Sequence, residues 1–443
     1  MKYGHLRKFV LYTLLYFVTA AIFASTVLFV KRPIENSDFS IVRLIIIAFA
    51  TVLLLKYTFY MLVSPWFEYL TAQRRKQLPN LIHHKPLVSV IIPAWNEEVG
   101  LLTTVKTLLE SSYHNLEIVV INDGSTDGSD QMMRSFIAKY ERETHSLLDR
   151  IHLIYYYQQN GGKGSALNSG IKLAHGDIVM SIDADCVVDR HAVRNFVRAF
   201  ADPRVMAAVG NVKIGNTQTL VGAIQHLEYL FSFYFKKGDS LLNTIYIIGG
   251  AAGAFRKEVF QRLGGYSTKN ITEDIELSIR IQEAGMRIAY VPDAVIYTEG
   301  ASNVRDLMKQ RLRWKRGRFE TFREHKALFF STKPHHNKLL TWFILPLAVF
   351  GDVQLAFELP FILILYIYSV ATHDFSTFVS GILIVSLIFF IQLVDERRNG
   401  KPFYLLLAPI GWLLFYLTTI VEVNALLKSL WGVTLRKLSP AAK

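Results

Sequence analysis

Cysteine is almost absent from this chain. Of its 443 residues only Cys186 is a cysteine, which excludes an intramolecular disulfide and a metal site built from cysteines. Acidic residues are also in short supply, with 36 Asp and Glu against 49 Lys and Arg, so the formal net charge is +13. Because a free cysteine behaves as a small apolar side chain, we expect Cys186 to be buried.

The excess of positive charge has two possible explanations. A strongly basic protein is often a nucleic-acid-binding protein, but much of the charge here flanks apolar segments. Lys2, Arg7 and Lys8 precede the first apolar run, and residues 74–76 (Arg-Arg-Lys) follow the second. Anionic lipid headgroups account more simply for charge in these places, and a polyanionic substrate or product could account for the rest. We therefore predict a lipid bilayer as partner and no nucleic acid.

Long apolar runs indicate several membrane spans. The chain is 51% hydrophobic and its mean hydropathy is +0.26. Residues 9–30 carry no charge, are long enough to cross a bilayer and lack a cleavage site, so we expect an uncleaved span. A second run, about 44–63, is interrupted by Lys56. Further apolar blocks follow at 339–370, 377–394 and 403–430, for four to six spans in all.

Between these runs the sequence turns polar, which divides the chain into three parts. We expect two N-terminal transmembrane helices in 1–64, a globular domain in 65–335 that ends in amphipathic interface helices, and a C-terminal transmembrane region in 336–443. Positive charge on both flanks of the N-terminal pair places its ends, and with them the globular domain, in the cytoplasm. Block 339–370 contains acids and prolines, which favours an interfacial or re-entrant piece followed by one span.

The globular domain begins with an alternation of strands and helices. A short β-branched, apolar run at Leu87–Pro93 predicts a buried parallel strand. Three further strands are predicted at Leu116–Asn122, Ile151–Tyr157 and Ile178–Ile182. Helical stretches of ten or more residues lie between them. This alternation is typical of an α/β fold with a doubly wound, mainly parallel sheet.

Polar residues gather where these strands end. Asn96, Asp123, Lys163 and Asp183 all fall at the carboxyl ends of the predicted strands, which is where such sheets bind their ligands. Asn96 also has the residue type to cap a helix whose first turn holds two glutamates. Taken singly, each motif has an ordinary structural explanation as a turn or loop, and their convergence is what favours a binding site.

Two aspartates at the end of the fourth strand point to a cation. Asp183 and Asp185 are two residues apart, so on a strand both carboxylates would face the same way. Like charges that close repel one another, and a divalent ion with oxygen ligands would relieve this repulsion. A solvated turn is the alternative for a lone Asp-x-Asp.

Acids also begin a later helix. In Thr272-Glu273-Asp274 the threonine is expected at the N-cap, and both acids fall in the first helical turn, where the helix dipole stabilises negative charge. That effect alone would explain the acids without any function. The small residues 249–253 that precede them would allow the close approach of a sugar chain.

A cationic segment, KQRLRWKRGRFETF (309–322), has apolar residues at helical spacing. This pattern predicts an amphipathic helix on the membrane surface, which does not exclude a catalytic role for Gln310, Arg313 and Trp314. The histidine pairs 83–84 and 335–336 show no repeated ligand spacing, and we expect them at the surface.

Four of these motifs resemble a known family. Residues 123–127 (Asp-Gly-Ser-Thr-Asp), the pair 183/185, residues 272–274 and Gln310-x-x-Arg-Trp stand in the order seen in processive family 2 glycosyltransferases. Cellulose, chitin and hyaluronan synthases belong to this group. The QRLRW and NITEDIELS segments are most similar to those of bacterial poly-β-1,6-N-acetylglucosamine synthases. The resemblance implies a GT-A-like domain inserted between transmembrane α-helices.

The resemblance implies a donor site and a metal. Asp123 would contact the uridine of a UDP-sugar, and Lys163 would help to hold it. Asp183 and Asp185 would engage the UDP and its divalent ion, Mg²⁺ or Mn²⁺, with Asp185 as the direct ligand. The residues expected to bind substrate on this side are Asn96, Glu98, Asp123, Lys163 and Asp183.

The resemblance also implies an acceptor site. Asp274 would be the general base that deprotonates the acceptor hydroxyl, with Glu273 beside it. Gln310, Arg313 and Trp314 would hold the acceptor sugar and the leaving diphosphate. Attack opposite the UDP inverts the anomeric carbon and gives a β-linkage.

The implied activity is polymerisation of a β-linked polysaccharide from a UDP-sugar, with UDP-N-acetylglucosamine the first choice. Expected partners are the growing polysaccharide and a small accessory membrane protein. The alternatives are a transferase that adds one sugar to a membrane lipid, and a non-catalytic sensor or translocation partner. After Trp314 the chain continues Lys-Arg-Gly-Arg, which is more cationic than in the β-1,6 synthases and leaves the sugar and its linkage open.

Overall fold

The computed structural model describes residues 40–77, 85–143, 151–373, 375–395 and 418–428, together with single helical positions between residues 10 and 24. Apart from those positions, the first predicted span (9–30) lies outside the described residues. So does the histidine pair 83–84. Of the predicted block 403–430, the structure describes only the helical part 418–428.

The central element is an eight-stranded sheet with the strand order β3-β2-β1-β4-β7-β6-β8-β5. In chain order the strands are β1 Val88–Ala94, β2 Leu116–Asp123, β3 His152–Gln158, β4 Ile178–Ser181, β5 Val187–Val188, β6 Val205–Ile214, β7 Gly253–Arg256 and β8 Arg287–Thr298. The pairs β1–β2, β2–β3, β1–β4 and β6–β8 are parallel, whereas β7 runs antiparallel to both β4 and β6, and β5 to β8. The sheet is therefore mixed, with the predicted parallel half at β1–β4.

Helices cover both faces of this sheet, as a doubly wound fold requires. One face packs against α4 Leu101–Leu109 and α7 Ala192–Ala199, and the other against α6 Lys163–Leu173, α9 Lys257–Leu263 and α10 Glu273–Glu283. Residues of β1 alternate between the two cores: Val90 and Ile92 join the first, and Ile91 the second. Burial on both faces explains why β1, β2 and β4 read as continuous apolar runs, whereas β3 at the edge of the sheet is partly exposed.

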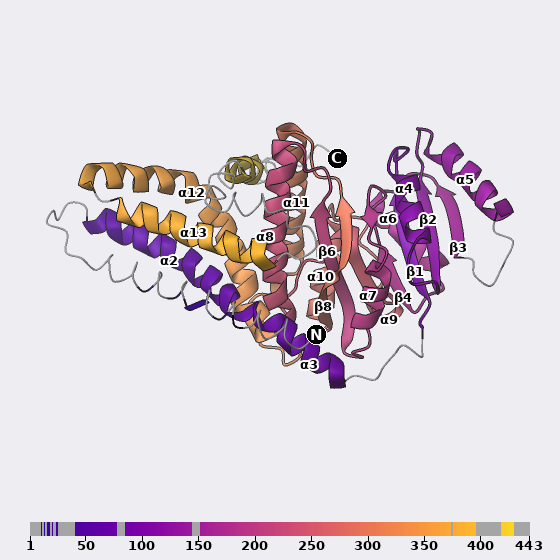
Figure 1. Cartoon of the computed structure of the whole chain (residues 1–443), viewed down its shortest axis with the longest axis horizontal. Helices are drawn as coiled ribbons and strands as arrows, with labels where there is room; N and C mark the ends of the chain where they lie inside the picture. The colour runs from indigo at the N-terminus through magenta and orange to yellow at the C-terminus, as the bar shows by residue number, and fades with distance from the viewer. Residues whose placement is uncertain are drawn as a thin grey trace.

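Long helices extend from one end of the sheet domain. Figure 1 shows α2 Ser40–Val63, α12 Leu345–Thr372 and α13 Ser376–Asp395 on one side of the molecule, with β1–β3 on the other. Between them lie α8 Leu220–Leu242 and α11 Val304–Glu324. The remaining helices are α3 Trp66–Gln77, α5 Ser129–Glu143, the short turns Gly250–Ala252 and Lys326–Leu328, and the π-turn Leu340–Ile344.

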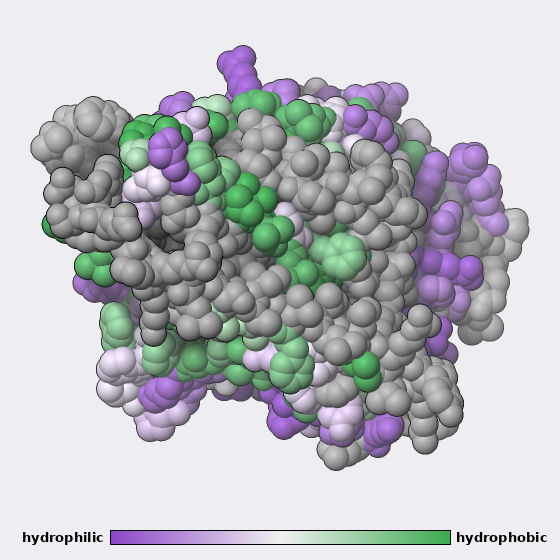
Figure 2. All heavy atoms as spheres, turned by 60° about the vertical axis from the view of Figure 1, so that its left-hand side comes forward, coloured by the Kyte–Doolittle hydropathy of each residue, from purple (hydrophilic) through white to green (hydrophobic). Residues whose placement is uncertain are grey.

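The helical end carries exposed apolar side chains. Ile41 and Leu44 of α2 and Phe357 and Leu363 of α12 are between 59% and 70% exposed, and Figure 2 shows hydrophobic residues gathered on the face where these helices lie. Leu340–Thr372 is the one helix among the described residues that is long and apolar enough to cross a membrane by composition. Exposed apolar area of this kind is typical of a surface that contacts lipid or protein.

The segment 340–372 differs from the prediction of a re-entrant piece followed by one span. It forms one continuous helix, although Pro360 lies inside it. Asp352, an acid that argued against a span, accepts hydrogen bonds from Lys315 (Nζ to Oδ1, 2.9 Å) and from Arg318 of α11. Its charge is compensated within the protein, so it does not interrupt the helix.

Candidate active site at the carboxyl ends of the strands

The loops that follow β1 and β2 are joined by reciprocal hydrogen bonds. Asn96 Oδ1 accepts the Thr126 N–H at 2.8 Å, and Glu98 Oε2 accepts the Gly128 N–H at 3.0 Å. In return, Asp127 accepts the Glu98 N–H at 3.1 Å. Asn96 and Glu98 therefore fix the shape of this edge of the sheet, while their predicted contact with substrate stays a prediction.

The prediction that Asn96 caps a helix was wrong. The helix α4 begins only at Leu101, with Gly100 at its N-cap, and Asn96 has a left-handed backbone with φ of 56°. The cross-loop hydrogen bonds hold Asn96 in this conformation, which asparagine tolerates better than most residues. Glu97 and Glu98 consequently lie in a loop and not in the first turn of a helix.

Asp123, at the end of β2, holds the glycine-rich loop. Its carboxylate accepts hydrogen bonds from Gln158 Nε2 at 2.6 Å and from the N–H groups of Gly161 and Gly162 at 3.0 and 2.8 Å. These two glycines directly precede Lys163. The family resemblance implies that Asp123 contacts the uridine of the donor. The structure shows that it also sets the path of the loop that delivers Lys163.

Lys163 connects the first half of the domain with the start of α10. Its Nζ donates to Asp183 Oδ1 at 2.5 Å and lies 3.6 Å from Glu273 Oε1. Burial alone would lower the pKa of Lys163, but the charges of Asp183, Glu273 and Asp274 outweigh it and raise this pKa above its ordinary value. The structure therefore brings three predicted site residues, Asp183, Glu273 and Asp274, together around the ammonium of a fourth, Lys163.

Asp274 lies at the start of α10 and is oriented by backbone groups. Its Oδ1 accepts the Ile275 N–H at 2.8 Å, and its Oδ2 accepts the Gly250 N–H at 2.9 Å. Burial raises the pKa of Asp274, and the Lys163 ammonium opposes that rise. Glu273 beside it is 7% exposed, and burial likewise raises its pKa. Thr272 occupies the N-cap position as predicted.

Asp185 follows Asp183 in an acidic environment. Burial raises the pKa of Asp185, and the charge of Asp183 adds to the effect. Burial and the charges of these two aspartates also raise the pKa of Glu97 to about 7. Glu97, expected only in the first turn of a helix, was not predicted as a site residue. Its position three residues after the end of β1 was the available signal. Cys186 is free and 1% exposed, as predicted.

A divalent cation fits this carboxylate pair. Within the described ranges no three His, Cys, Asp or Glu side chains form a metal site by themselves. Mg²⁺ in nucleotide sites is typically held by one or two carboxylates together with substrate phosphates. Asp183 and Asp185 offer two hard oxygen donors, and burial together with the charge of Asp183 raises the pKa of Asp185. The two carboxylates could therefore supply the protein ligands of such a site.

The helix α11 carries Gln310, Arg313 and Trp314. Arg313 is exposed and Trp314 half-buried, and Gln310 Oε1 is buried without a hydrogen-bond partner in the part of the chain that the structure describes. A buried acceptor without a donor costs free energy. The Gln310 Oε1 is therefore able to accept a hydrogen bond from a hydroxyl group of a ligand. Gly317 brings this helix against Thr272, because a Cβ at Gly317 would lie 2.2 Å from Thr272 Oγ1.

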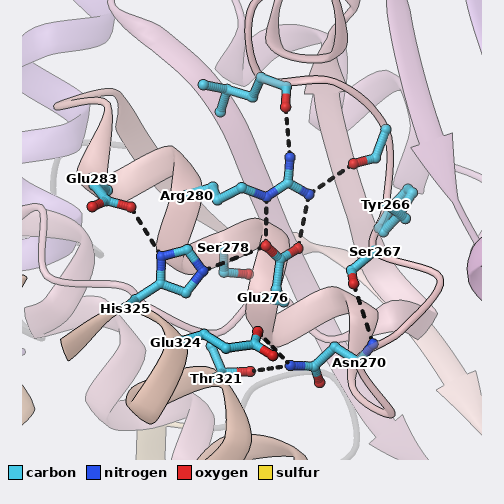
Figure 3. A network of polar contacts seen from close by, with 12 residues as sticks. Tyr266, Ser267, Asn270, Glu276, Ser278, Arg280, Glu283, Thr321, Glu324 and His325 are labelled. Atoms are coloured by element: carbon cyan, nitrogen blue, oxygen red, sulfur yellow. Dashed lines mark hydrogen bonds and ion pairs between the residues drawn. The ribbon is translucent and has the colours of Figure 1, made fainter. Parts of the chain in front are cut away.

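Polar contacts join α10 to the end of α11 (Figure 3). His325 bridges Glu283, at 2.9 Å from Nδ1, and Glu276, at 3.5 Å from Nε2. Arg280 pairs with Glu276 at 2.7 Å. Nearby, Asn270 Nδ2 donates to Thr321 Oγ1 at 3.1 Å. The elements that carry Asp274 and Trp314 are thus held as one unit.

Tertiary contacts modify two expectations about cations and histidines. Within the predicted amphipathic helix, Arg311, Lys315 and Arg318 of α11 pair with carboxylates inside the protein. The predicted surface pair 335–336 is half correct, because His336 is 3% exposed and hydrogen-bonds Ser331 and the Glu283 carbonyl. Both interactions depend on tertiary partners that a one-dimensional pattern does not show.

Known proteins resemble this chain in sequence. Residues 89–264 match the family Glycosyl transferase family 2, and residues 178–419 match Glycosyl transferase family group 2. Over 283 residues the chain is 31% identical to a poly-beta-1,6-N-acetyl-D-glucosamine synthase of Staphylococcus aureus (strain COL), covering 62% of this chain and 65% of that protein. It is 31% identical over 292 residues to the probable glycosyltransferase YdaM of Bacillus subtilis (strain 168), covering 63% and 67%.

A solved structure resembles it in fold. The mannosyltransferase PcManGT from Pyrobaculum calidifontis, in complex with GDP-Man and Mn²⁺, matches with a TM-score of 0.52 and 20% identity over 89% of this chain and 99% of that one. The chain spans about 65% of the length of the Staphylococcus synthase it matches. The second family match alone covers more than half of the chain: the protein belongs to the family 2 glycosyltransferases and has their GT-A-like fold.

Proposed function

We propose that this protein transfers N-acetylglucosamine from UDP-N-acetylglucosamine to a growing β-linked polysaccharide, with inversion at the anomeric carbon. The observation that carries the proposal is the cluster around Lys163, where Asp183, Glu273 and Asp274 converge on one ammonium. Sequence similarity to a poly-β-1,6-N-acetylglucosamine synthase favours this sugar. The name of that relative also supports polymerisation over single transfer.

On the donor side, the chain supplies carboxylates and a cation. Asp183 and Asp185 would hold Mg²⁺ or Mn²⁺, which would offset the charge that develops on the departing diphosphate. Lys163, on the loop fixed by Asp123, would contact the same phosphates. Its present partner Asp183 would turn to the cation when donor binds, which would free the ammonium for the diphosphate.

On the acceptor side, Asp274 is the group suited to remove a proton. Its carboxylate is fixed by two backbone N–H groups, and a raised pKa makes it a stronger base. The acceptor hydroxyl oxygen bonds to the anomeric carbon, the bond from that carbon to the diphosphate oxygen breaks, and the hydroxyl proton passes to Asp274. Gln310, Arg313 and Trp314 would orient the acceptor sugar.

The helical end would place this enzyme in the membrane. We propose two N-terminal spans within 1–64, a cytoplasmic domain over 65–335 and further spans within 336–443, with the cell membrane as location. The apolar helix Leu340–Thr372 supports this arrangement. The growing chain would leave through these helices, and a small accessory membrane protein could join them there.

The test is sugar transfer by the purified full-length protein in lipid. UDP-N-acetylglucosamine and UDP-glucose are offered separately with Mg²⁺, Mn²⁺ or a chelator. We expect high-molecular-weight product from UDP-N-acetylglucosamine only, and none with the chelator. Asp274→Asn should lower the rate by about 10²–10⁴-fold with UDP affinity retained.

Asp177→Asn is the matched control, because this exposed aspartate precedes β4 at the opposite end of the strand. It should leave the transfer rate unchanged. A single sugar added to lipid would favour the lipid-directed alternative. UDP binding without transfer from either donor would contradict the proposed activity.

A further inference from the structure

The helix α11 is fixed to three other helical segments by a cluster of alternating charges. The cluster consists of Glu228 of α8, Arg311, Lys315 and Arg318 of α11, Asp352 of α12 and Glu422 in segment 418–428. Lys315 bridges Glu422 at 2.6 Å and Asp352 at 2.9 Å. Three cations face three carboxylates, so the cluster as a whole is neutral and can be buried.

Arg311 is the most buried cation in this cluster and the one nearest the acceptor motif. It is 6% exposed. Its Nη2 donates to Glu228 Oε2 at 2.7 Å, and its Nε lies 3.5 Å from Glu422 Oε1. Its guanidinium carbon stands 4.6 Å from the ring centroid of Trp314, which is within the range of a cation–π contact. The guanidinium is therefore held by two carboxylates and covers one part of the indole.

The orientation of Trp314 then depends on residues outside its own helix. A guanidinium buried in this way needs its carboxylate partners, because an uncompensated buried charge is strongly unfavourable. If one partner loses its charge, Arg311 would turn toward the other or toward water and leave the indole. Trp314 would lose the contact that limits its side-chain rotation, and the face it offers to a sugar ring would no longer be fixed.

We propose that Glu228 and Glu422 are positioning residues, which hold Arg311 against Trp314 and so fix the indole face that receives the acceptor glycan. The inference rests on the proposed function, because it deepens the role given there to Trp314. It makes the segment 418–428 part of the acceptor site, although this segment lies more than a hundred residues beyond the motif.

The test separates acceptor binding from the other steps. Full-length Glu228→Gln and Glu422→Gln proteins in lipid receive UDP-N-acetylglucosamine and a short β-linked N-acetylglucosamine oligosaccharide. We expect the KM for the oligosaccharide to rise about tenfold, which corresponds to about 1.4 kcal/mol and lies within the range of a cation–π contact. The KM for the donor and the rate of donor hydrolysis should not change. Glu422→Asp keeps the charge and should restore part of the affinity.

Glu320→Gln is the matched control. Glu320 pairs with Arg316 on the same helix at 3.0 Å and does not belong to the cluster, so its substitution should leave both KM values unchanged. An unchanged oligosaccharide KM in both cluster variants would overturn the proposal. The proposal would also be overturned if the cluster variants lost rate equally with the donor and with the oligosaccharide and had a lower melting temperature. That result would indicate a purely structural role.

A second readout does not require activity. Fluorine NMR of fluorotryptophan-labelled protein, with the Trp314 line assigned through Trp314→Phe, reports the surroundings of the indole. We expect this line to shift or broaden in Glu228→Gln and Glu422→Gln and to stay in place in Glu320→Gln. If the Trp314 line shifts in the two cluster variants but the protein transfers no sugar, the positioning role of Glu228 and Glu422 stands. Only the proposed function is then contradicted. An unmoved line would overturn the positioning even in an active enzyme.

Discussion

Gly250 lies where any side chain would meet the charged centre of the site. Its N–H donates to Asp274. A Cβ at this position would stand 2.7 Å from Lys163 Nζ and 3.6 Å from Asp183 Oδ1. A Cβ added at the neighbouring Gly249 would have no heavy atom within 4 Å. The two glycines, adjacent in sequence, therefore differ in what a methyl group would do.

Gly250→Ala should damage activity without unfolding the protein. The colliding atom is the flexible end of Lys163, which can move away at little cost to stability, but its pairing with Asp183 would be lost. We expect the transfer rate to fall at least about tenfold, which is the effect of roughly 1.4 kcal/mol on the barrier, with an unchanged melting temperature. Gly249→Ala should match the wild type in both measurements. Equal activity of the two variants would show that Lys163 has no role in transfer.

At the scale of elements, the contact between α10 and α11 sets the distance from Asp274, the proposed base, to the proposed acceptor-binding residues of α11. Gly317 permits this contact, because a Cβ there would lie 2.2 Å from Thr272 Oγ1 and 2.4 Å from its Cγ2. Thr272 is 4% exposed and cannot move freely. A change at Gly317 therefore acts on the start of α10, where Asp274 lies.

Gly317→Ala should destabilise the protein despite better helix propensity. Alanine in a helix is favoured over glycine by about 1 kcal/mol, but overpacking typically costs about 1–3 kcal/mol. We expect a lower melting temperature and reduced transfer. Gly351→Ala in α12 provides the comparison, because no heavy atom lies within 4 Å of a Cβ there. A melting temperature that rises in both variants would show that α10 and α11 are not in tight contact.

The bridge from His325 to α10 makes the same contact depend on pH. The hydrogen bond with Glu276 raises the pKa of His325, burial opposes this, and Glu283 raises it further. A pKa raised on folding stabilises the protein fully below the unfolded value of about 6.5. That stabilisation is lost as pH rises through the folded pKa. Arg280 also pairs with Glu276, at 2.7 Å.

His325→Gln should therefore matter most in acid. We expect the wild type to exceed the variant in stability by about 1.5–3 kcal/mol near pH 6, the usual contribution of a hydrogen bond to a charged group, and by much less near pH 9. Thermal melting across this range measures the difference. A gap that stays constant with pH would mean that His325 contributes by packing and not by its charge.

Sequence patterns predicted the elements that are decided locally. The four parallel strands end within one residue of their predicted bounds. Three of them, β1, β2 and β4, are buried on both faces and are therefore continuous apolar runs, whereas β3 is a partly exposed edge strand. The start of α4 was missed, since hydrogen bonds from residues about thirty positions away hold Asn96 at φ of 56°. The contact of Lys163 with Glu273 also could not be predicted, because it joins elements 110 positions apart.

At the scale of the whole molecule, the sheet domain and the apolar helices must lie on defined sides of the membrane. A nucleotide-sugar donor is available in the cytoplasm, so the proposed function requires the domain there. The side of the membrane on which each part lies can be tested by labelling added cysteines, because the single native cysteine, Cys186, is free but only 1% exposed. In the folded state, wild-type protein should therefore give little background with thiol reagents.

Single added cysteines would report the side of each part. Ser37→Cys lies in the loop between the two predicted N-terminal spans, and Ser302→Cys lies at an exposed position just before α11. A membrane-impermeant maleimide should label Ser37→Cys in intact cells, and Ser302→Cys only after permeabilisation. The opposite pattern would place the site outside the cell, away from its proposed donor. Labelling of both positions in intact cells would contradict a membrane passage between them, and with it the expectation that positive charge at residues 74–76 marks the cytoplasmic side.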